Sequence, residues 1–114
     1  MTLEELRRKK DVAVVVAGHN GKIQFVNERF TDLFGWNLKE ITGRPLSTII
    51  PPTLHDAHNL GFSRFLTTEK PSLLNQPLKL KAVTKDGKVF EAEHFITAEK
   101  SEGHWQFGAS IRPL

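Results

Sequence analysis

The stretch NERFTDLFGWNLKEITGR, residues 27–44, predicts two short helices in immediate succession, each with its own start signal. Asn27 stands where its side chain can cap the first helix, and Gly35 stands where that helix should end. Asn37 and Glu40 have the spacing of a capping box at the start of the second helix. The first helix carries an apolar stripe, which consists of Phe30, Leu33 and Phe34.

Before these helices the sequence predicts a β-hairpin. Residues 11–17 are β-branched and apolar, which is typical of a buried strand. The glycine-flanked residues 18–21 form a tight turn, and residues 22–26 then alternate as a second strand. The alternation predicts that Ile23 and Phe25 share one face, and that Gln24 and Val26 share the other.

After the helices comes a proline-punctuated connector at residues 45–52, and then the longest helical pattern, residues 54–66. Three strands follow, joined by turns at residues 85–88 and 101–103. Alternation along these strands predicts one inward face, made of Leu78, Leu80, Ala82, Phe90, Ala92, His94, Ile96, Trp105, Phe107, Ala109 and Ile111.

This order of elements, with two strands, a run of helices and a three-strand meander, predicts an α+β fold. We expect one antiparallel sheet with the short helices packed on one face. The domain should span residues 11–114, preceded by a flanking helix within residues 1–10. That helix carries Leu3 and Leu6 on one side and is too short to be stable alone, so it must pack on its own domain or on a partner chain.

The second face of the sheet is predicted to be partly apolar, because alternation along the strands places Val26, Val83 and Phe95 on that face. Together with the N-terminal helix, this face suggests a symmetric homodimer. Deleting residues 1–10 is then expected to weaken the dimer in sedimentation equilibrium. An unchanged dissociation constant would contradict that interface.

Composition restricts the function classes. The chain of 114 residues has a net charge of +3, spread lysines and no arginine-rich run, so we expect no direct binding to nucleic acid. No apolar run approaches the roughly 20 residues of a membrane span, and the charged N-terminus lacks the apolar core of a signal peptide. These features favour a cytoplasmic domain that does not contact membranes.

The sequence offers little for catalysis. There is no cysteine, so disulfides, thiolate ligands and cysteine nucleophiles are excluded. No glycine-rich loop joins a strand to a helix, as a phosphate-binding loop would, and no motif surrounds a serine nucleophile. We therefore expect a chain that is not an enzyme.

In combination the motifs resemble the PAS domain family over residues 11–112. The matching pieces are, in order, Asn27, Phe30, Phe34-Gly35-Trp36, residues 38–41, Gly43-Arg44, Ile50-Pro51, Lys85-Asp86-Gly87 and Ser110-Ile111-Arg112. The resemblance implies a five-stranded antiparallel sheet that cups a pocket closed by the helices. It also implies a sensor of small molecules, cofactors or proteins.

Domains of this family sit within histidine kinases, cyclic-dinucleotide enzymes, chemoreceptors and transcription regulators. The resemblance therefore implies an effector domain in the same polypeptide. Flavin photoreceptors of the family need a reactive cysteine for their photoadduct, and this chain has none. That photochemistry is excluded, whereas noncovalent flavin binding stays open.

His58 is the leading candidate for cofactor binding. It lies on the apolar stripe of the long helix, together with Leu54 and Phe65. With Ile50-Pro51 ahead of it, this segment resembles bacterial haem-PAS oxygen sensors, whose proximal histidine follows the proline by seven residues. The resemblance implies His58 as the axial ligand of a haem iron. The residues implied around the porphyrin are Phe62, Leu73, Leu78, His94, Ile96 and Ala109.

Two positions depart from those oxygen sensors. Leu78 stands where they carry an arginine, and His94 stands in a wall that is aliphatic in them. His94 would then ligate the iron or donate a hydrogen bond to a bound gas. The alternative is that both histidines are hydrogen-bonded core residues in a ligand-free interaction module.

Overall fold

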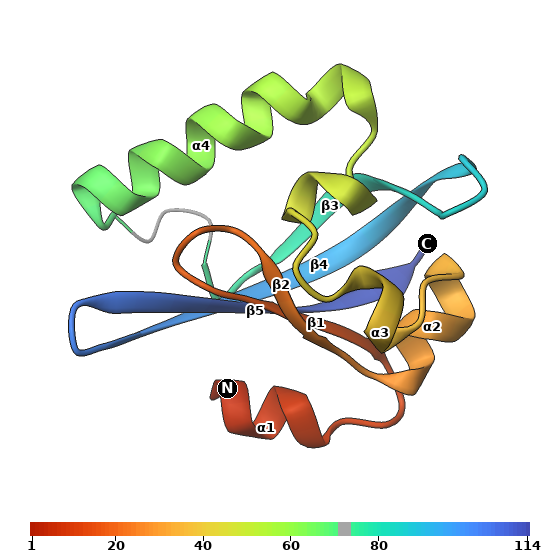
Figure 1. The fold of residues 1–114 in the computed structure, drawn as a ribbon, viewed down its shortest axis with the longest axis horizontal. Coiled ribbons are helices and arrows are strands. Elements are labelled where there is room, and N and C mark those ends of the chain that lie inside the picture. Colours follow the sequence, from red (N-terminus) through yellow and green to blue (C-terminus); the bar gives the residue numbers. More distant parts are fainter. Residues whose placement is uncertain (71–73) are drawn as a thin grey trace.

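The five strands form one antiparallel sheet in the spatial order β2-β1-β5-β4-β3, so the first and last strands of the chain are neighbours (Figure 1). The structure, a computed structural model, describes residues 1–70 and 74–114. The strands are β1 (Ala13–Ala17), β2 (Ile23–Val26), β3 (Pro77–Val83), β4 (Val89–Ser101) and β5 (His104–Pro113). The predicted five-stranded antiparallel α+β fold is confirmed.

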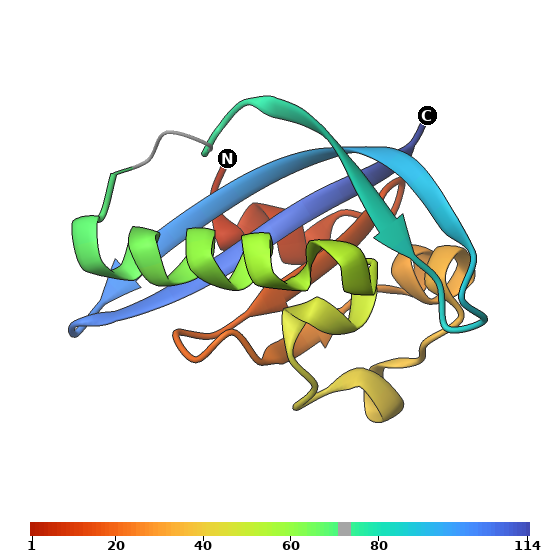
Figure 2. The same ribbon diagram turned by 90° about the horizontal axis from the view of Figure 1, so that it is seen from above.

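The helices lie on both sides of this sheet. They are α1 (Leu3–Arg8), α2 (Glu28–Phe34), α3 (Leu38–Ile41) and α4 (His55–Thr68), with short 3-10 helices η1 (Leu46–Ile49) and η2 (Pro52–Leu54). The last three α-helices lie on one face of the sheet, called the inner face below, and α1 lies on the opposite, outer face (Figures 1 and 2). The longest helix thus begins one residue later and ends two residues later than the sequence predicts.

A closed hydrophobic core occupies the inner face at the β1–β2 end. It consists of Ala13, Val15, Ile23, Val26, Phe30, Phe34, Ile41, Ile49, Ala82, Ala92 and Ile111. Phe30 and Phe34 stack at 4.3 Å between ring centroids, as their one-turn spacing on α2 allows. This core fixes α2 and α3 on the sheet. The predicted caps are confirmed: Asn27 and Gly35 bound α2, and Asn37 and Glu40 form the capping box of α3.

Asn27 also joins three segments of the backbone. Its Oδ1 atom accepts hydrogen bonds from the Phe30 amide at 3.0 Å and from the Val14 amide at 2.9 Å. Its Nδ2 group donates to the carbonyl oxygens of Lys9 and Val12 at 3.0 and 2.8 Å. One half-buried side chain therefore ties the start of α2 to β1 and to the segment that leads into it.

The predicted face assignment of β2 is wrong for Phe25 and Val26. Val16 pairs with Phe25 and Ala17 with Ile23, so Gln24 is an additional residue in β2. Such a bulge interrupts strict alternation, because two residues of one strand then oppose one of the other. Phe25 consequently packs on the outer face, and Val26 joins Ile23 in the inner core.

The α1 helix packs on the outer face of its own sheet. Leu3 and Leu6 are buried against Val12, Val14 and Val16. Both faces of β1 are therefore covered, which explains its unbroken apolar sequence. Because α1 covers this part of the sheet and Val26 points inward, most of the apolar surface that suggested a dimer is used within the protomer.

Gly108 lies on β5 at the point where α1 packs against the sheet. A Cβ atom at this position would lie 2.5 Å from Leu3 Cδ2 and 2.9 Å from Leu6 Cδ1, closer than packed atoms approach. The Glu99 carboxylate accepts a hydrogen bond of 2.8 Å from the Leu3 amide at the start of the helix. A side chain at position 108 would therefore force Leu3 and Leu6 to shift while α1 stays on the sheet.

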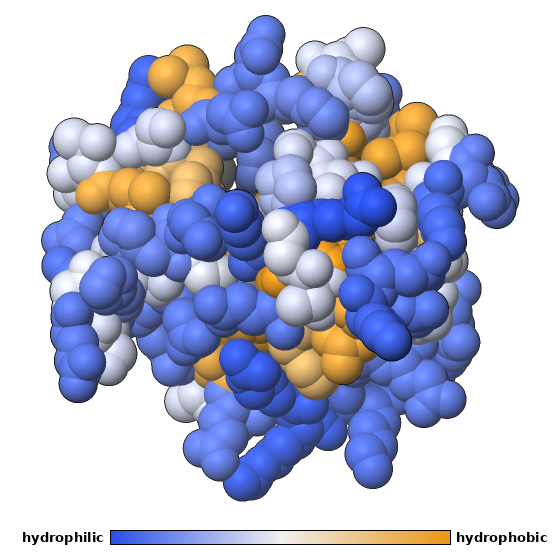
Figure 3. Space-filling view, viewed as in Figure 1, coloured by the Kyte–Doolittle hydropathy of each residue, from blue (hydrophilic) through white to orange (hydrophobic). Residues whose placement is uncertain are grey.

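No helix within the described residues is long and apolar enough to cross a membrane. On the face shown in Figure 3 hydrophilic side chains predominate, and the hydrophobic side chains gather in small separated groups.

Replacing Asn27 by alanine should destabilise the domain more than replacing the capping residue Asn37. Asn37→Ala removes one N-cap and should cost about 1 kcal/mol. Asn27→Ala removes the cap and three further hydrogen bonds, which at about 1 kcal/mol each should cost about 2–4 kcal/mol. Urea denaturation measures both values, and equal losses would contradict the joining role of Asn27.

Gly108→Ala should destabilise the domain by about 1–3 kcal/mol through overpacking against α1. The penalty should disappear when residues 1–8 are deleted, because the leucines that the new Cβ meets are then absent. Gly61→Ala is the matched control, since nothing lies within 4 Å of that position and alanine favours a helix. If Gly108→Ala still lowers the free energy of unfolding of the truncated chain, contact with α1 is not the cause of the destabilisation.

Candidate functional site

Four of the predicted site residues form one patch on the inner face of the sheet. Leu78 on β3 pairs with His94 on β4, and Ile96 on β4 pairs with Ala109 on β5. Directly opposed residues of antiparallel strands project from the same face, and so do residues two apart on one strand. These four residues are called the inner patch below. Leu73 lies outside the described residues.

The other two predicted residues, His58 and Phe62, lie on α4. The side of α4 that faces the sheet is only half-buried, and it carries His55, His58, Phe62, Phe65 and Leu66. No side chain of this helix is buried, although it has 14 residues. The helix runs along the sheet (Figure 2). Because it buries no side chain, it is loosely packed on the sheet.

Aromatic contacts hold the middle of α4 against β5. The Phe62 ring lies 5.0 Å from Phe107, and the Phe65 ring lies 5.5 Å from Phe107 and 4.9 Å from Trp105. Pairs at such separations stabilise a packed interface beyond the area they bury. These contacts place α4 over the same face of the sheet as the inner patch.

The C-terminal end of α4 is fixed by Glu69, which adopts a left-handed conformation with φ 55°. Its carboxylate accepts hydrogen bonds from Lys100 Nζ at 2.7 Å and from Trp105 Nε1 at 2.9 Å. The ammonium group of Lys100 beside it lowers the pKa of this carboxyl group, with the Trp105 hydrogen bond as a further cause. The helix is thus fixed at its end and middle.

His58 lies one turn before Phe62, with its ring stacked at 6.2 Å from the Phe62 ring. It makes no hydrogen bond to any residue in the described part of the chain. Burial lowers the pKa of His58, and the neighbouring His55 lowers it further. His55, unlike His58, has a hydrogen-bond partner, because its Nε2 atom lies 2.7 Å from the Ile50 carbonyl oxygen. The neutral form of His58 is therefore favoured, and its ring nitrogens have no hydrogen-bond partner among the described residues.

His94 is buried at 9% exposure in the inner patch. Its Nδ1 atom lies 3.3 Å from the Ala92 carbonyl oxygen, a long contact for a hydrogen bond. Burial lowers the pKa of His94, and the Ala92 contact opposes that shift. In the described residues Nε2 has no hydrogen-bond partner, so this atom is the free polar group of the patch.

The donor set fits a haem better than a metal ion held by protein alone. Within the residues that the structure describes, no group of three or more His, Cys, Asp or Glu side chains is placed to hold a metal. A haem needs only an axial side chain from the protein, and a neutral, partly exposed imidazole serves. His58 meets this requirement, and Leu78, Ile96 and Ala109 provide apolar surface on the facing strands.

Sequence reasoning missed the residues that position α4. Alternation places Phe107 and Trp105 on the inward face, and the three-residue spacing of Phe62 and Phe65 places them on one face of the helix. Neither signal shows which aromatic residues meet. Nothing in the sequence identifies Glu69 as an anchor, because its partner Lys100 lies 31 residues away.

Comparison with known proteins identifies the family. The sequence pattern of the PAS fold matches residues 8–108. The chain therefore belongs to the PAS family, and it is a sensory domain of the kind found in kinases and sensor proteins.

Three similar proteins illustrate the range. The PAS domain of a protein from Desulfitobacterium hafniense has a TM-score of 0.75 at 16% identity, over 97% of this chain and 99% of its own. A PAS domain from a two-component sensor histidine kinase has a TM-score of 0.73 at 15% identity, over 96% and 91%. A probable serine/threonine-protein kinase of Dictyostelium discoideum is 22% identical over 95% of this chain, which spans 7% of that protein's length.

The two histidines should make stability depend on pH. Their folded-state pKa values are lowered, so as pH falls below about 6.5 the unfolded chain takes up protons first and the folded state loses stability. The urea midpoint should therefore fall between about pH 7.5 and 5.5, and less steeply for His94→Leu than for the wild type. A midpoint that rises over this interval would contradict the assignment.

Proposed function

We propose that this PAS domain binds a small, flat and mostly apolar molecule between α4 and the inner patch. The observation that carries the proposal is that α4 buries no side chain, although it lies over an apolar face of the sheet. A helix of this kind normally gains its stability from a buried face. A molecule that contacts both layers would supply the missing burial.

The polar groups at this interface suggest how such a molecule is oriented. His58 offers a neutral ring nitrogen from the helix, and His94 offers a second from β4. Apolar surfaces with a few polar groups are typical of small-molecule sites. Haem is the candidate that would use both histidines: His58 would hold the iron, and His94 would be a second ligand or would donate a hydrogen bond to a bound gas. When bound, haem supplies an iron centre able to bind diatomic gases.

The rival function is a ligand-free interaction module. One observation favours it: the inner face at the β1–β2 end is closed by a core in which Phe30 and Ile41 are fully buried. If side chains alone fill the space between α4 and the inner patch, then His58 and His94 are core residues. In that case the exposed side of α4 would be a surface that binds other proteins. Binding measurements separate the two functions.

We also propose where this domain acts and on which kind of partner. We expect it to have no catalytic activity and to act in the cytoplasm on an effector domain of the same polypeptide. The kinases among the similar proteins favour a kinase effector, although a cyclic-dinucleotide enzyme, chemoreceptor or transcription regulator fits the same role. We also propose a homodimer through Val83 and Phe95, which lie half-buried at the outer face beyond the core under α1.

Titration of the purified domain with haemin tests the ligand. Stoichiometric binding with a sharp Soret band, lost in His58→Ala and shifted in His94→Ala, would support haem as the cofactor. His104→Ala is the matched control, because that histidine is exposed at the start of β5 and should not affect binding. Binding that is indifferent to His58→Ala would reject the axial ligand.

A second measurement tests the site without assuming haem. An apolar fluorescent probe should bind the domain, and Ala109→Trp should block binding by filling the inner patch with a large ring. If the probe fails to bind, or binds the wild type and Ala109→Trp equally, the ligand-free interaction module becomes the better account.

A further inference from the structure

Two histidine rings meet where the turn between β1 and β2 lies beside the turn between β4 and β5. The rings of His19 and His104 lie 5.5 Å apart between centroids, at an angle of 83°. The Trp105 amide donates a hydrogen bond of 3.0 Å to His19 Nδ1. Because an accepting Nδ1 atom carries no proton, the proton of the neutral ring is on Nε2. The His19 ring is therefore held in one orientation and presents a donor.

Two glutamine side chains lie beside this histidine pair. The rings of Trp105 and Phe107 contact α4 on the inner face, so alternation along β5 places His104 and Gln106 on the outer face. The Gln106 Nε2 group donates a hydrogen bond of 2.9 Å to Gln24 Oε1. The two glutamines and the two histidines are thus joined in pairs at the same end of the sheet.

These side chains line one hollow with a volume of about 510 Å³, within the range of small-molecule sites. Gln24 closes it over Gly18, where a Cβ atom would lie 2.6 Å from Gln24 Nε2 and 3.5 Å from Asn20 Oδ1. In the described part of the chain, no Asp, Glu, Lys or Arg belongs to its lining. A charged molecule would lose hydration there without gaining an ion pair, so an uncharged ligand is favoured.

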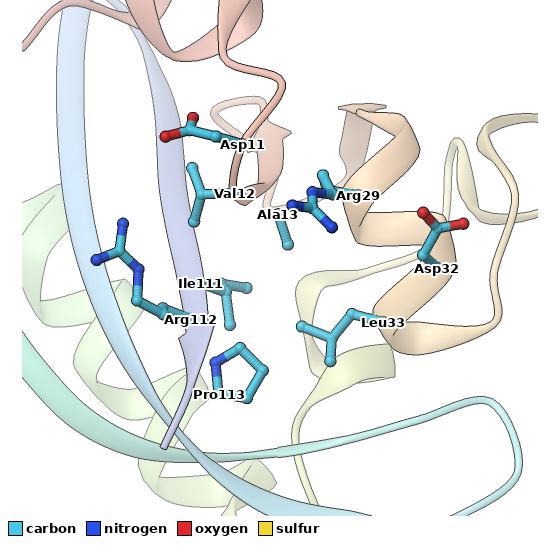
Figure 4. Close-up of a pocket in the computed structure, with 9 residues that line it drawn as sticks. All are labelled: Asp11, Val12, Ala13, Arg29, Asp32, Leu33, Ile111, Arg112 and Pro113. Atoms are coloured by element: carbon cyan, nitrogen blue, oxygen red, sulfur yellow. The ribbon is translucent and has the colours of Figure 1, made fainter.

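A second hollow, between α2 and the end of β5, differs in this respect. It has a volume of about 330 Å³ and carries charged side chains at its rim (Figure 4). Ile111 faces the inner core, so Arg112 beside it projects to the outer face, away from Arg29 and Asp32 of α2. Because its charges do not converge, we assign no ligand to that hollow.

The glutamine pair presents one donor and one acceptor side by side. Gln24 Oε1 and Gln106 Nε2 are bonded to each other, which leaves Gln24 Nε2 and Gln106 Oε1 for a ligand. Exchanging oxygen and nitrogen in both amides swaps the two roles and leaves the same combination. An anion would meet the carbonyl oxygen, and a cation would meet the amide hydrogens. An uncharged edge with its own acceptor and donor satisfies both glutamines.

We propose that this hollow binds an uncharged flat heterocycle with a donor beside an acceptor, of which the adenine base of a free nucleoside is the simplest example. Bases stack on histidine rings in proteins, and glutamine amides pair with the N6 and N7 edge of adenine. The rings of His19 and His104 form a corner, so a base stacked on one ring meets the other with its edge.

This site does not rest on the ligand proposed beneath α4, because His104 and Gln106 point away from that helix. Each part of the nucleoside has a separate role in the site. The flat ring supplies the stacking surface, and the exocyclic amino group supplies the donor that Gln106 Oε1 accepts. Analogues that lack one of these parts therefore test the roles one at a time.

The test is an NMR titration of the ¹⁵N-labelled chain with adenosine, in which the side-chain amide signals of glutamine report on the site directly. Saturable shifts should appear at the Nε2 signals of Gln24 and Gln106 and at the backbone amide of Trp105. Purine riboside lacks the exocyclic amino group and should bind about fivefold more weakly, because one hydrogen bond is not formed. Ribose lacks the base and should not bind.

Variants assign the roles of the side chains. His104→Ala removes a stacking surface and should weaken adenosine binding at least about fivefold. Gln106→Leu removes the acceptor and should abolish the preference for adenosine over purine riboside. Asn59→Leu, which replaces an exposed amide side chain of α4, is the matched control and should leave binding unchanged. The backbone amide spectrum of each variant reports whether it is folded.

A short oligoadenylate distinguishes a free nucleoside from a base within a nucleic-acid strand. Because the described lining has no Lys or Arg to neutralise phosphates, the oligoadenylate should bind no more tightly than adenosine. Tighter binding of the oligoadenylate would assign the site to nucleic acid and overturn the proposal.

Three further results would overturn it. These are no saturable shift at the glutamine signals at millimolar adenosine, equal binding of adenosine and purine riboside to the wild type, or unchanged adenosine binding by folded His104→Ala. Shifts confined to α4 and the inner patch would likewise refute it, and they would bear on the other site alone.

Discussion

The fold depends above all on the hydrogen bonds of Asn27. Its amide oxygen starts α2 and accepts from β1, and its amide nitrogen holds the segment that links α1 to β1. Because one side chain satisfies backbone groups in three segments, the position of α2 and the path of α1 are set together. Two features follow from this arrangement: the closed core over β1 and β2, and the packing of α1 on the outer face.

The two halves of the inner face differ in how completely they are packed. Over β1 and β2 the short helices bury phenylalanines and an isoleucine, so this half is rigid. Over β3, β4 and β5 the longest helix buries nothing and relies on aromatic contacts and on Glu69 at its end. The function that we propose places the ligand in the second half, since a loosely packed layer can respond to a bound molecule at a low free-energy cost.

Prediction from the sequence was reliable for features that depend only on residues close together in the chain. The caps of α2 and α3 were predictable because Asn and Gly act on their own neighbours, and the glycine turns of the hairpins were predictable for the same reason. Alternation also placed Leu78, His94, Ile96 and Ala109 on one face, as the register confirms. It failed at Phe25 and Val26, because the bulge at Gln24 depends on pairing with β1 and not on the residues of β2 alone.

By itself, then, the sequence determined the family, the order of elements and the side of the sheet on which the candidate histidines lie. Only the tertiary structure decided that α1 packs on its own sheet over Gly108, that Phe107 receives α4, and that His19, Gln24 and His104 line one hollow. The physical reason is separation along the chain. Local signals fix backbone conformation within a few residues, whereas contacts between distant segments depend on how complete elements pack.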